Sequence, residues 1–199
     1  MERIELGGRR RLPSGQRVID KMLIRHMGII PKFSLKAWSL KIYGLVEEPR
    51  TLTWNEFLKL PKVTSISDFH CVEGWSVLDN KWEGVLFKEI VNVAKPKKKA
   101  RYVTFECDDD YTTSLPLGDL LDDDVLLAHK LNNENLKPEN GGPLRLIVPK
   151  KYAYKSAMWL RGIRFTSEKE SGYWEKRGYS YTADPWKEDR YEKAPHLDF

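Results

Sequence analysis

Short strand patterns separated by turns, with few helical patterns between them, limit the folds open to this chain. Apolar runs and alternations predict strands at residues 38–43, 63–69, 102–107, 111–115, 125–131, 144–148 and 159–165. A capping box at Thr53 predicts a short helix that ends before Pro61, and helical spacing at 86–94 predicts a second. Strand and helix do not alternate regularly, so the pattern favours an α+β fold over a doubly wound one.

Two smaller features complete the predicted pattern. Residues 117–121 read as a brief helical turn, and Asn132 with Asn133 predicts a hairpin at the end of the 125–131 strand. No segment rich in Pro, Gly and Ser divides the 199 residues, so we expect one domain over 1–199. Residues 167–199 lack periodicity, but their tryptophans and tyrosines predict that this segment wraps onto the body and buries its rings.

Composition excludes several classes of protein. Hydrophobic residues make up 41% and charged residues 32%, which is typical of a soluble globular protein. No apolar run approaches the roughly 20 residues that span a bilayer. Two cysteines make no disulfide framework, and the charged start of the chain lacks the pattern of a secretory signal. We therefore expect a cytoplasmic protein without a membrane span.

Basic clusters raise the alternative of a nucleic-acid-binding module. The formal net charge is +5, and lysines crowd residues 95–99 while arginines occupy 9–11. Acidic clusters at 108–110 and 122–124 are interspersed with them, and basic runs of this length are usually solvated loops. The sequence therefore favours no nucleic-acid partner.

Cys71 is the strongest candidate for a residue that takes part in chemistry. It follows the strand predicted at 63–69, within residues 68–76 that read DFHCVEGWS, and Gly74 lies three positions on. A thiol just past a strand, beside a flexible glycine, is easily presented to a cavity, where it serves as a metal ligand or a nucleophile. The alternative is a buried small hydrophobe, which is our interpretation of Cys107.

Two segments carry a resemblance to a known family. Residues 68–76, and residues 142–160 reading GPLRLIVPKKYAYKSAMWL, resemble the sulfite oxidase family of molybdopterin-dependent oxidoreductases, in the branch with only the catalytic molybdopterin domain. The resemblance covers roughly residues 23–190 and includes GYWE at 172–175 and ADPW at 183–186. It implies a mixed-sheet molybdopterin-binding domain with short helices.

The resemblance also implies a cofactor and a set of site residues. Cys71 would bind molybdenum beside the pterin, as both metal ligand and catalytic residue. His129, on the segment 119–131 that resembles the strand lining the metal cavity, stands where sulfite oxidases have a tyrosine and would handle a proton. The other residues implied to contact the cofactor or its phosphate are Arg25, His26, His70, Lys150, Tyr152, Ala153, Lys155 and Ser156. Taken singly, Arg25 and His26 are more typical of ordinary surface groups, and Lys155 and Ser156 are as typical of a solvated basic loop. The alternative for His129 is a half-buried histidine with satisfied hydrogen bonds.

Three departures from the family pattern bear on the substrate. Met158 replaces a usual lysine, Asp110 replaces a usual glycine at a turn, and no arginine follows Cys71 to hold an anionic substrate. Trp75 follows instead, which indicates a more apolar mouth. The resemblance thus implies oxygen-atom transfer to or from a small sulfite, sulfoxide or N-oxide substrate.

The sequence also leads to an expectation about the source of electrons and leaves one alternative function open. No haem-binding segment precedes the resemblance, so we expect a separate electron-transfer partner. The alternative is a catalytically inactive molybdopterin-binding or interaction protein on the same scaffold, for which Met158 and the missing arginine are the motivation.

Overall fold

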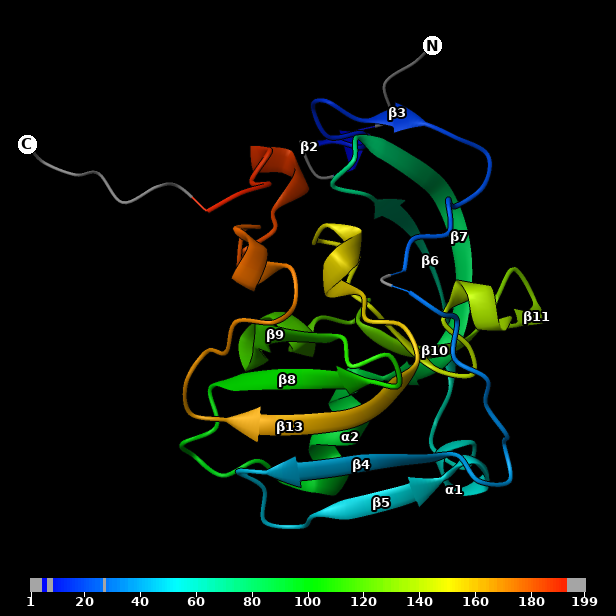
Figure 1. Cartoon of the computed structure of the whole chain (residues 1–199), viewed down its shortest axis with the longest axis vertical. Coiled ribbons are helices and arrows are strands. Elements are labelled where there is room, and N and C mark those ends of the chain that lie inside the picture. Colours follow the sequence, from blue (N-terminus) through cyan, green and yellow to red (C-terminus); the bar gives the residue numbers. More distant parts are fainter. Residues whose placement is uncertain (1–4, 7–8, 27, 193–199) are drawn as a thin grey trace, which may run out of the picture.

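A five-stranded mixed sheet forms one half of the molecule. The computed structural model describes residues 5–6, 9–26 and 28–192, without the side chains of 5, 6, 9 and 10 (Figure 1). The sheet has the order β5-β4-β13-β8-β9. Its strands are β4 (Ser39–Gly44), β5 (Arg50–Thr53), β8 (Tyr102–Cys107), β9 (Thr112–Pro116) and β13 (Leu160–Thr166). β13 runs parallel to β4, and the other pairs are antiparallel.

A six-stranded sheet forms the other half. Its path is β11-β10-β7-β3, with β12 paired to β10 and β6 paired to β7. The bounds are β3 (Arg17–Val18), β6 (Val63–His70), β7 (Trp75–Leu86), β10 (Leu126–Leu131), β11 (Glu134–Asn135) and β12 (Arg145–Ile147). β1 (Glu5–Leu6) and β2 (Arg9–Arg10) form a separate antiparallel pair. Both larger sheets contain one parallel pair, so the mixed-sheet α+β prediction is confirmed.

β7 is the longest of the strands that the sequence analysis missed. It runs for 12 residues and curves along one edge of the molecule (Figure 1). Charged and polar residues at 79–81 and Gly84 interrupt its apolar pattern, which hides it from a search for alternation. The backbone of β10 approaches Gly84 so closely that a Cβ added at this position would lie 2.2 Å from the Leu127 carbonyl oxygen. Gly84 therefore allows the pairing that joins β7 to β10.

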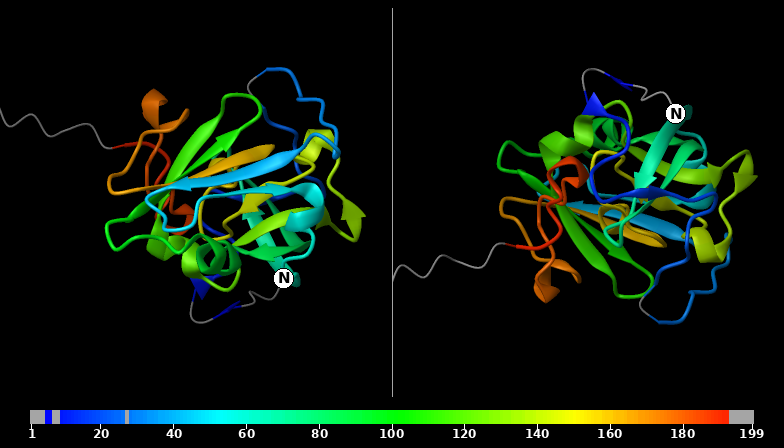
Figure 2. Two further views of the ribbon diagram at one scale, coloured as in Figure 1. Left: turned by 90° about the horizontal axis from the view of Figure 1, so that it is seen from below. Right: turned by 90° about the horizontal axis from the view of Figure 1, so that it is seen from above.

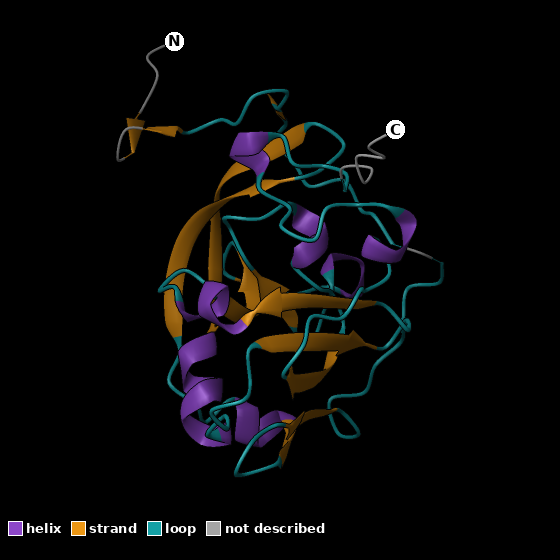
Figure 3. Cartoon of the chain, turned by 90° about the vertical axis from the view of Figure 1, so that its left-hand side faces the viewer, coloured by secondary structure: helices purple, strands orange, loops and turns teal. Residues whose placement is uncertain are grey.

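Helices are short and few (Figure 3). α1 (Trp54–Phe57) begins at the predicted capping box, where the Thr53 side chain accepts from the Glu56 amide and the Glu56 carboxylate accepts from the Thr53 amide. α2 (Phe87–Ala94) buries Phe87, Ile90 and Ala94 against the first sheet. The 3-10 turns are η1 (Leu117–Leu121), η2 (Pro138–Asn140), η3 (Ala153–Lys155), η4 (Glu175–Arg177) and η5 (Pro185–Lys187).

Two hydrophobic clusters fill the interior. The larger lies between the five-stranded sheet and α2, with Leu40, Phe105 and Ile163 fully buried. The smaller lies on the inner face of the six-stranded sheet and includes Phe69, Trp82 and Cys71 with its neighbours. Burying such side chains contributes about 1.5–3 kcal/mol each, which makes these clusters the main source of stability. Cys71 thus lies at the edge of a packed core.

The C-terminal segment lies against the body, as the views in Figure 2 show. The Tyr152 amide donates to the Ala183 carbonyl over 2.8 Å, and the Arg190 guanidinium donates to the Val72 carbonyl. Residues 193–199 of the predicted wrapping segment lie outside the described residues. No helix in the described part of the chain is long and apolar enough to cross a bilayer. The single domain and the cytoplasmic location stay predictions.

Candidate functional site

The turn that carries Cys71 joins β6 to β7. The Cys71 amide donates to the Trp75 carbonyl over 2.8 Å, and the Gly74 amide donates to the Cys71 carbonyl over 3.0 Å. Gly74 has φ +91°, a conformation that L side chains rarely adopt. The glycine therefore closes the turn and fixes where the thiol points, as its position after the strand predicted.

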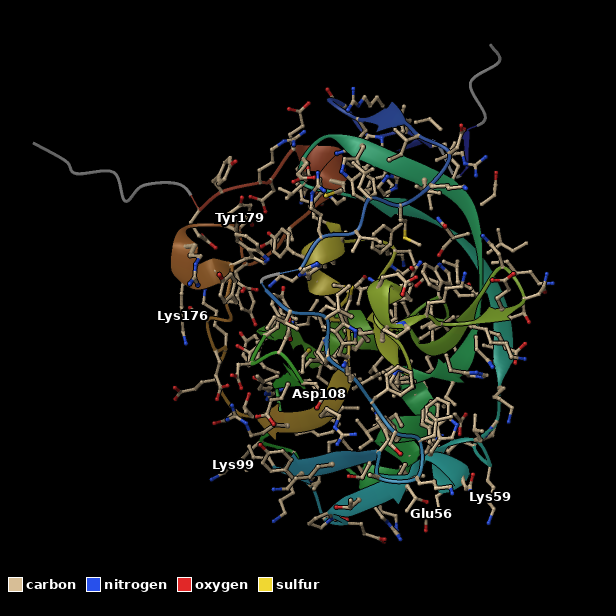
Figure 4. All side chains as sticks on the ribbon, turned by 45° about the vertical axis from the view of Figure 1, so that its right-hand side comes forward. Glu56, Lys59, Lys99, Asp108, Lys176 and Tyr179 are labelled. Carbon is tan, nitrogen blue, oxygen red and sulfur yellow. The ribbon has the colours of Figure 1, made fainter. Side chains whose placement is uncertain are left out.

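The Cys71 thiol lines a cavity of about 260 Å³. Segments far apart in the sequence form its walls: residues 22–26, the Cys71 turn, residues 109–111, residues 139–145, residues 153–158, and the C-terminal segment. Phe69, Trp75 and Met158 make much of the wall apolar. Tyr179 brings the C-terminal segment into the wall and lies above Lys176 in Figure 4. Both ends of the chain thus contribute to one site.

Burial controls the protonation of the Cys71 thiol. Only 7% of the residue is exposed, and desolvation raises the pKa of the thiol to about 11. The apo protein therefore holds a protonated thiol near neutral pH. A soft metal binds the thiolate, so binding must displace this proton and becomes tighter as the pH rises toward 11.

Glu73 connects the thiol to the wall formed by residues 22–26. Its carboxylate lies 2.8 Å from Arg25 Nε, accepts from Trp75 Nε1 over 3.0 Å, and lies 3.9 Å from Cys71 Sγ. The Arg25 guanidinium lowers the pKa of Glu73, which keeps the carboxylate charged. This network holds Arg25 beside the thiol.

Arg145 is a cavity residue that the sequence analysis missed. It comes from β12, is 4% exposed, and packs its guanidinium over Phe69 and Trp82. Nη1 donates to the Asn140 carbonyl over 3.0 Å and Nη2 to the Ser156 carbonyl over 3.1 Å, while buried Nε has no hydrogen-bond partner among the described residues. Desolvation lowers its pKa to about 10, so it stays a cation at neutral pH. The sequence did contain a signal for this residue, because Arg145 is the one charged residue in the apolar strand predicted at 144–148.

Arg145 forms no ion pair within the described chain, and burying a cation without a counter-charge is unfavourable. Binding of an anion in the cavity would therefore stabilise it. The cavity thus combines a thiol with a buried guanidinium that forms no ion pair with a described residue, although Glu73, Asp109 and Glu139 line other parts of its wall.

Comparison with known proteins identifies the chain. The model of the oxidoreductase molybdopterin-binding domain matches residues 26–174, which include the Cys71 turn and most cavity walls. The chain belongs to this molybdopterin oxidoreductase family. As a member it is an oxidoreductase on a molybdopterin-binding scaffold, and the resemblance found in the sequence is confirmed.

Curated proteins similar to this chain include the following three. An uncharacterized oxidoreductase, YuiH, of Bacillus subtilis is 42% identical over 91% of this chain and 92% of its own length. The YedZ1 putative protein-methionine-sulfoxide reductase subunit of Azospira oryzae is 32% identical over 73% of this chain. The MsrP catalytic subunit of Campylobacter jejuni, a protein-methionine-sulfoxide reductase, is 31% identical over 75%. The chain covers 55% and 56% of these last two proteins.

A solved structure shares the family fold. The sulfane dehydrogenase SoxCD of Paracoccus pantotrophus aligns with a TM-score of 0.68 over 73% of this chain and 42% of that chain, at 24% identity. This likeness supports the fold assignment alone.

Four of the residues expected to contact the cofactor line the cavity of this molybdopterin oxidoreductase. They are Arg25, His26, Ala153 and Ser156. The Ser156 hydroxyl already accepts from the Val148 amide over 3.0 Å, and it can still donate to a ligand. Met158 lines the same cavity, so a thioether lies there in place of the lysine that the resemblance implied.

His70 and Tyr152 lie behind the cavity wall. Both are buried, and their backbones form a parallel bridge. His70 Nδ1 lies 2.8 Å from the Ser76 hydroxyl, its ring meets Trp186 edge-on, and burial lowers its pKa to about 4. A neutral histidine at this position supports the turn, and neither residue lines the cavity.

Lys155 and Lys150, expected to contact a cofactor phosphate, do not line the Cys71 cavity. The Lys155 ammonium is fully buried, pairs with Glu175 and donates to the Ser114 carbonyl over 3.2 Å. Lys150 lies 2.6 Å from Asp122 and lines a second cavity of about 170 Å³. The sequence placed both side chains in one basic loop, but the η3 turn sends Lys155 inward and leaves Lys150 outside.

His129 also lies away from the Cys71 cavity. Leu126 and Ala128 of β10 pack in the cluster that contains Cys71, so alternation turns His129 to the opposite face. Its ring meets Trp54 edge-on, and Nε2 lies 3.6 Å from Glu83. Segment 119–131 contributes no residue to the Cys71 cavity and lines the second cavity through Asp119 and Asp124. The structure therefore gives no support to a catalytic role for His129.

Replacing His129 provides a direct check. We expect His129→Phe to change turnover by less than about twofold, because the ring faces an aromatic neighbour and not the cavity. Steady-state rates with a reduced dye as electron source measure the effect. A loss of about a hundredfold with unchanged thermal stability would contradict this placement.

The cavity fits the molybdenum cofactor in its donor chemistry. Cys71 supplies the soft sulfur that molybdenum accepts, and Arg145 supplies a buried cation whose Nε lacks a partner among the described residues. Arg25 and His26, in the lining segment 22–26, add polar groups to the cavity wall. A phosphate-bearing pterin would satisfy this charge.

Proposed function

We propose that this oxidoreductase reduces a sulfoxide to a thioether, with Cys71 as the molybdenum ligand. The observation that carries the proposal is one largely apolar cavity lined by both the Cys71 thiol and the Arg145 guanidinium, whose Nε has no hydrogen-bond partner among the described residues. The cofactor, when bound, supplies the oxygen-atom transfer. In the net reaction the sulfoxide oxygen leaves as water, with two electrons and two protons consumed.

The residues of the chain divide the remaining work. Cys71 binds the metal as a thiolate, and Arg145, Arg25 and His26 hold anionic groups of the cofactor by charge and hydrogen bonds. Phe69 and Trp75 exclude water, which strengthens those interactions in the cavity. The thiol proton leaves Sγ when the cofactor is loaded.

Two observations favour a sulfoxide over sulfite. Residues 72–77 contain no arginine beside Cys71, and Phe69, Trp75 and Met158 give the cavity an apolar lining. Two relatives carry the name of protein-methionine-sulfoxide reductase. A separate electron donor is part of the proposal, which the name "catalytic subunit" of the Campylobacter relative supports.

The function is tested on protein produced in a molybdate-replete host. Molybdenum and released pterin, each near one per protein chain, would support cofactor binding. A reduced viologen dye then supplies electrons for reduction of free methionine sulfoxide, and sulfite oxidation is measured with an acceptor dye in parallel. Sulfite oxidation without sulfoxide reduction would reject the proposed direction and substrate.

Arg145 gives a further prediction. We expect Arg145→Met to lower the pterin content by about tenfold, because the cavity loses its buried cation, and Arg145→Lys to retain part of the content. Pterin fluorescence per protein measures the effect, and circular dichroism checks the fold. Full pterin content in the Met variant would contradict the anchoring role.

A further inference from the structure

A side-chain hydrogen bond holds the Cys71 backbone from outside its own turn. Gln16 Nε2 donates to the Cys71 carbonyl over 3.0 Å, across 55 positions of sequence. Gln16 directly precedes β3, at the top of Figure 1, and the pairing of β3 with β7 brings it to the turn. It lies before residue 26, where the match to the molybdopterin-binding domain begins. The early part of the chain therefore contributes a contact that the matched domain does not contain.

The Gln16 amide is oriented by a chain of hydrogen bonds that runs to His70. A carbonyl only accepts, so the NH2 group of Gln16 faces Cys71, and its Oε1 faces the Ser76 hydroxyl over 2.9 Å. Oε1 also only accepts, so the Ser76 hydroxyl donates its one proton to it. The Ser76 oxygen then accepts from His70 Nδ1 over 2.8 Å. Each link therefore has one direction, and His70 carries its proton on Nδ1.

Burial makes this chain of hydrogen bonds rigid. Ser76 and His70 are both buried, so water does not replace a broken link, and a polar group left without a partner there is unfavourable. The Cys71 carbonyl also accepts from the Gly74 amide over 3.0 Å, so both of its lone pairs are used. The peptide that carries the thiol is thus held from the turn and from Gln16 at once.

We infer that Gln16 is a positioning residue for Cys71, which holds the thiol in one orientation toward the cavity. The inference rests on the proposed role of Cys71 as the molybdenum ligand and adds a residue that does not itself contact the metal. Removing a side chain that orients a metal ligand typically lowers metal affinity by about 10–100-fold. His70 and Ser76 act through Gln16, which gives buried His70 a role without direct contact to the cofactor.

The first test needs no cofactor. In a Cys107→Ser background Cys71 is the one remaining cysteine, and its rate of alkylation by iodoacetamide reports how firmly the turn holds the thiol. Gln16→Glu keeps an acceptor for the Ser76 hydroxyl, but the ionised carboxylate cannot donate to the Cys71 carbonyl. Gln16→Met removes the amide without adding a charge. We expect alkylation about fivefold faster in both variants, because the turn opens more often when one hydrogen bond is lost.

Asn80 supplies the matched control. It is a buried side chain of β7, its amide donates to the Val77 carbonyl over 2.8 Å, and it does not line the Cys71 cavity. Asn80→Leu therefore removes a buried amide donor from the same strand without touching the Cys71 turn, and the alkylation rate should stay unchanged. An equal increase in Asn80→Leu, or no increase in either Gln16 variant, would overturn the positioning role.

The second test uses protein produced in a molybdate-replete host. We expect molybdenum per chain to fall by about tenfold in Gln16→Met. The electron paramagnetic resonance signal of the remaining one-electron-reduced metal should also shift, because its g values depend on the orientation of the bound sulfur. A loss of stability alone would lower the metal content without changing that signal. Wild-type content and signal in Gln16→Met would overturn the inference. Absence of molybdenum from the wild-type protein would instead reject the proposed function, and the alkylation rates would then decide the positioning role.

Discussion

Replacement of Cys71 by serine should abolish turnover and metal retention. The hydroxyl is a hard, poorly ionised ligand, whereas molybdenum with a dithiolene favours soft sulfur. Cys71→Ser keeps the size of the side chain and the turn around Gly74. We expect sulfoxide reduction to fall by at least about a hundredfold, and molybdenum per chain to fall with it. Both are measured on protein purified in parallel with wild type.

Cys107 offers a matched control for this experiment. It is the second cysteine, packs beside the larger hydrophobic cluster and does not line the Cys71 cavity. Burial raises the pKa of its thiol well above the usual value, so it is an inert core group. Cys107→Ser should keep its molybdenum and its turnover per metal. Equal molybdenum in both variants would remove Cys71 from the metal site.

Lys155→Met should destabilise the protein more than any other single change considered. Lys155 and Glu175 form a fully buried ion pair, and Glu175 also accepts from the Thr113 hydroxyl over 2.9 Å. Removing the ammonium leaves a buried carboxylate without its cation, which costs about 3–5 kcal/mol. For a chain of this size the melting temperature should fall by about 10 °C. Calorimetry or circular dichroism measures the shift.

A double variant separates a structural role from a cofactor role. Lys155→Met with Glu175→Gln removes both charges, so we expect it to recover most of the lost stability. It should also recover wild-type pterin content, because neither side chain lines the Cys71 cavity. Pterin loss in a double variant of normal stability would return Lys155 to the phosphate site that the sequence suggested.

The sequence predicted the elements that depend on local chemistry. The capping box at Thr53 and the helical turn at 117–121 are formed as expected. Asn132 and Asn133 both adopt positive φ in the predicted hairpin, and so does Asp110 at the turn where the resemblance implied glycine. Each of these outcomes depends on residues within a few positions of one another.

The site was harder to predict because its geometry depends on distant packing. The basic run 150–155 gives no sign that Glu175, 20 positions away, would neutralise Lys155. The bulge between Ala128 and Lys130 and the choice of face for His129 follow from pairing with β7, a strand that the sequence did not reveal. Arg145 looked like one polar interruption in an apolar strand, and only the folded walls make it a cavity residue.

The two ends of the chain share the Cys71 turn. β3, near the start, donates from the Arg17 amide to the Gly74 carbonyl, and Arg190, near the end, donates to the Val72 carbonyl. Trp174 and Tyr179 close the pocket from that same late segment. The cavity is therefore complete only after residues as late as Tyr179 have been synthesised and have folded onto the Cys71 turn. A cofactor that needs all of these walls would bind only after that point.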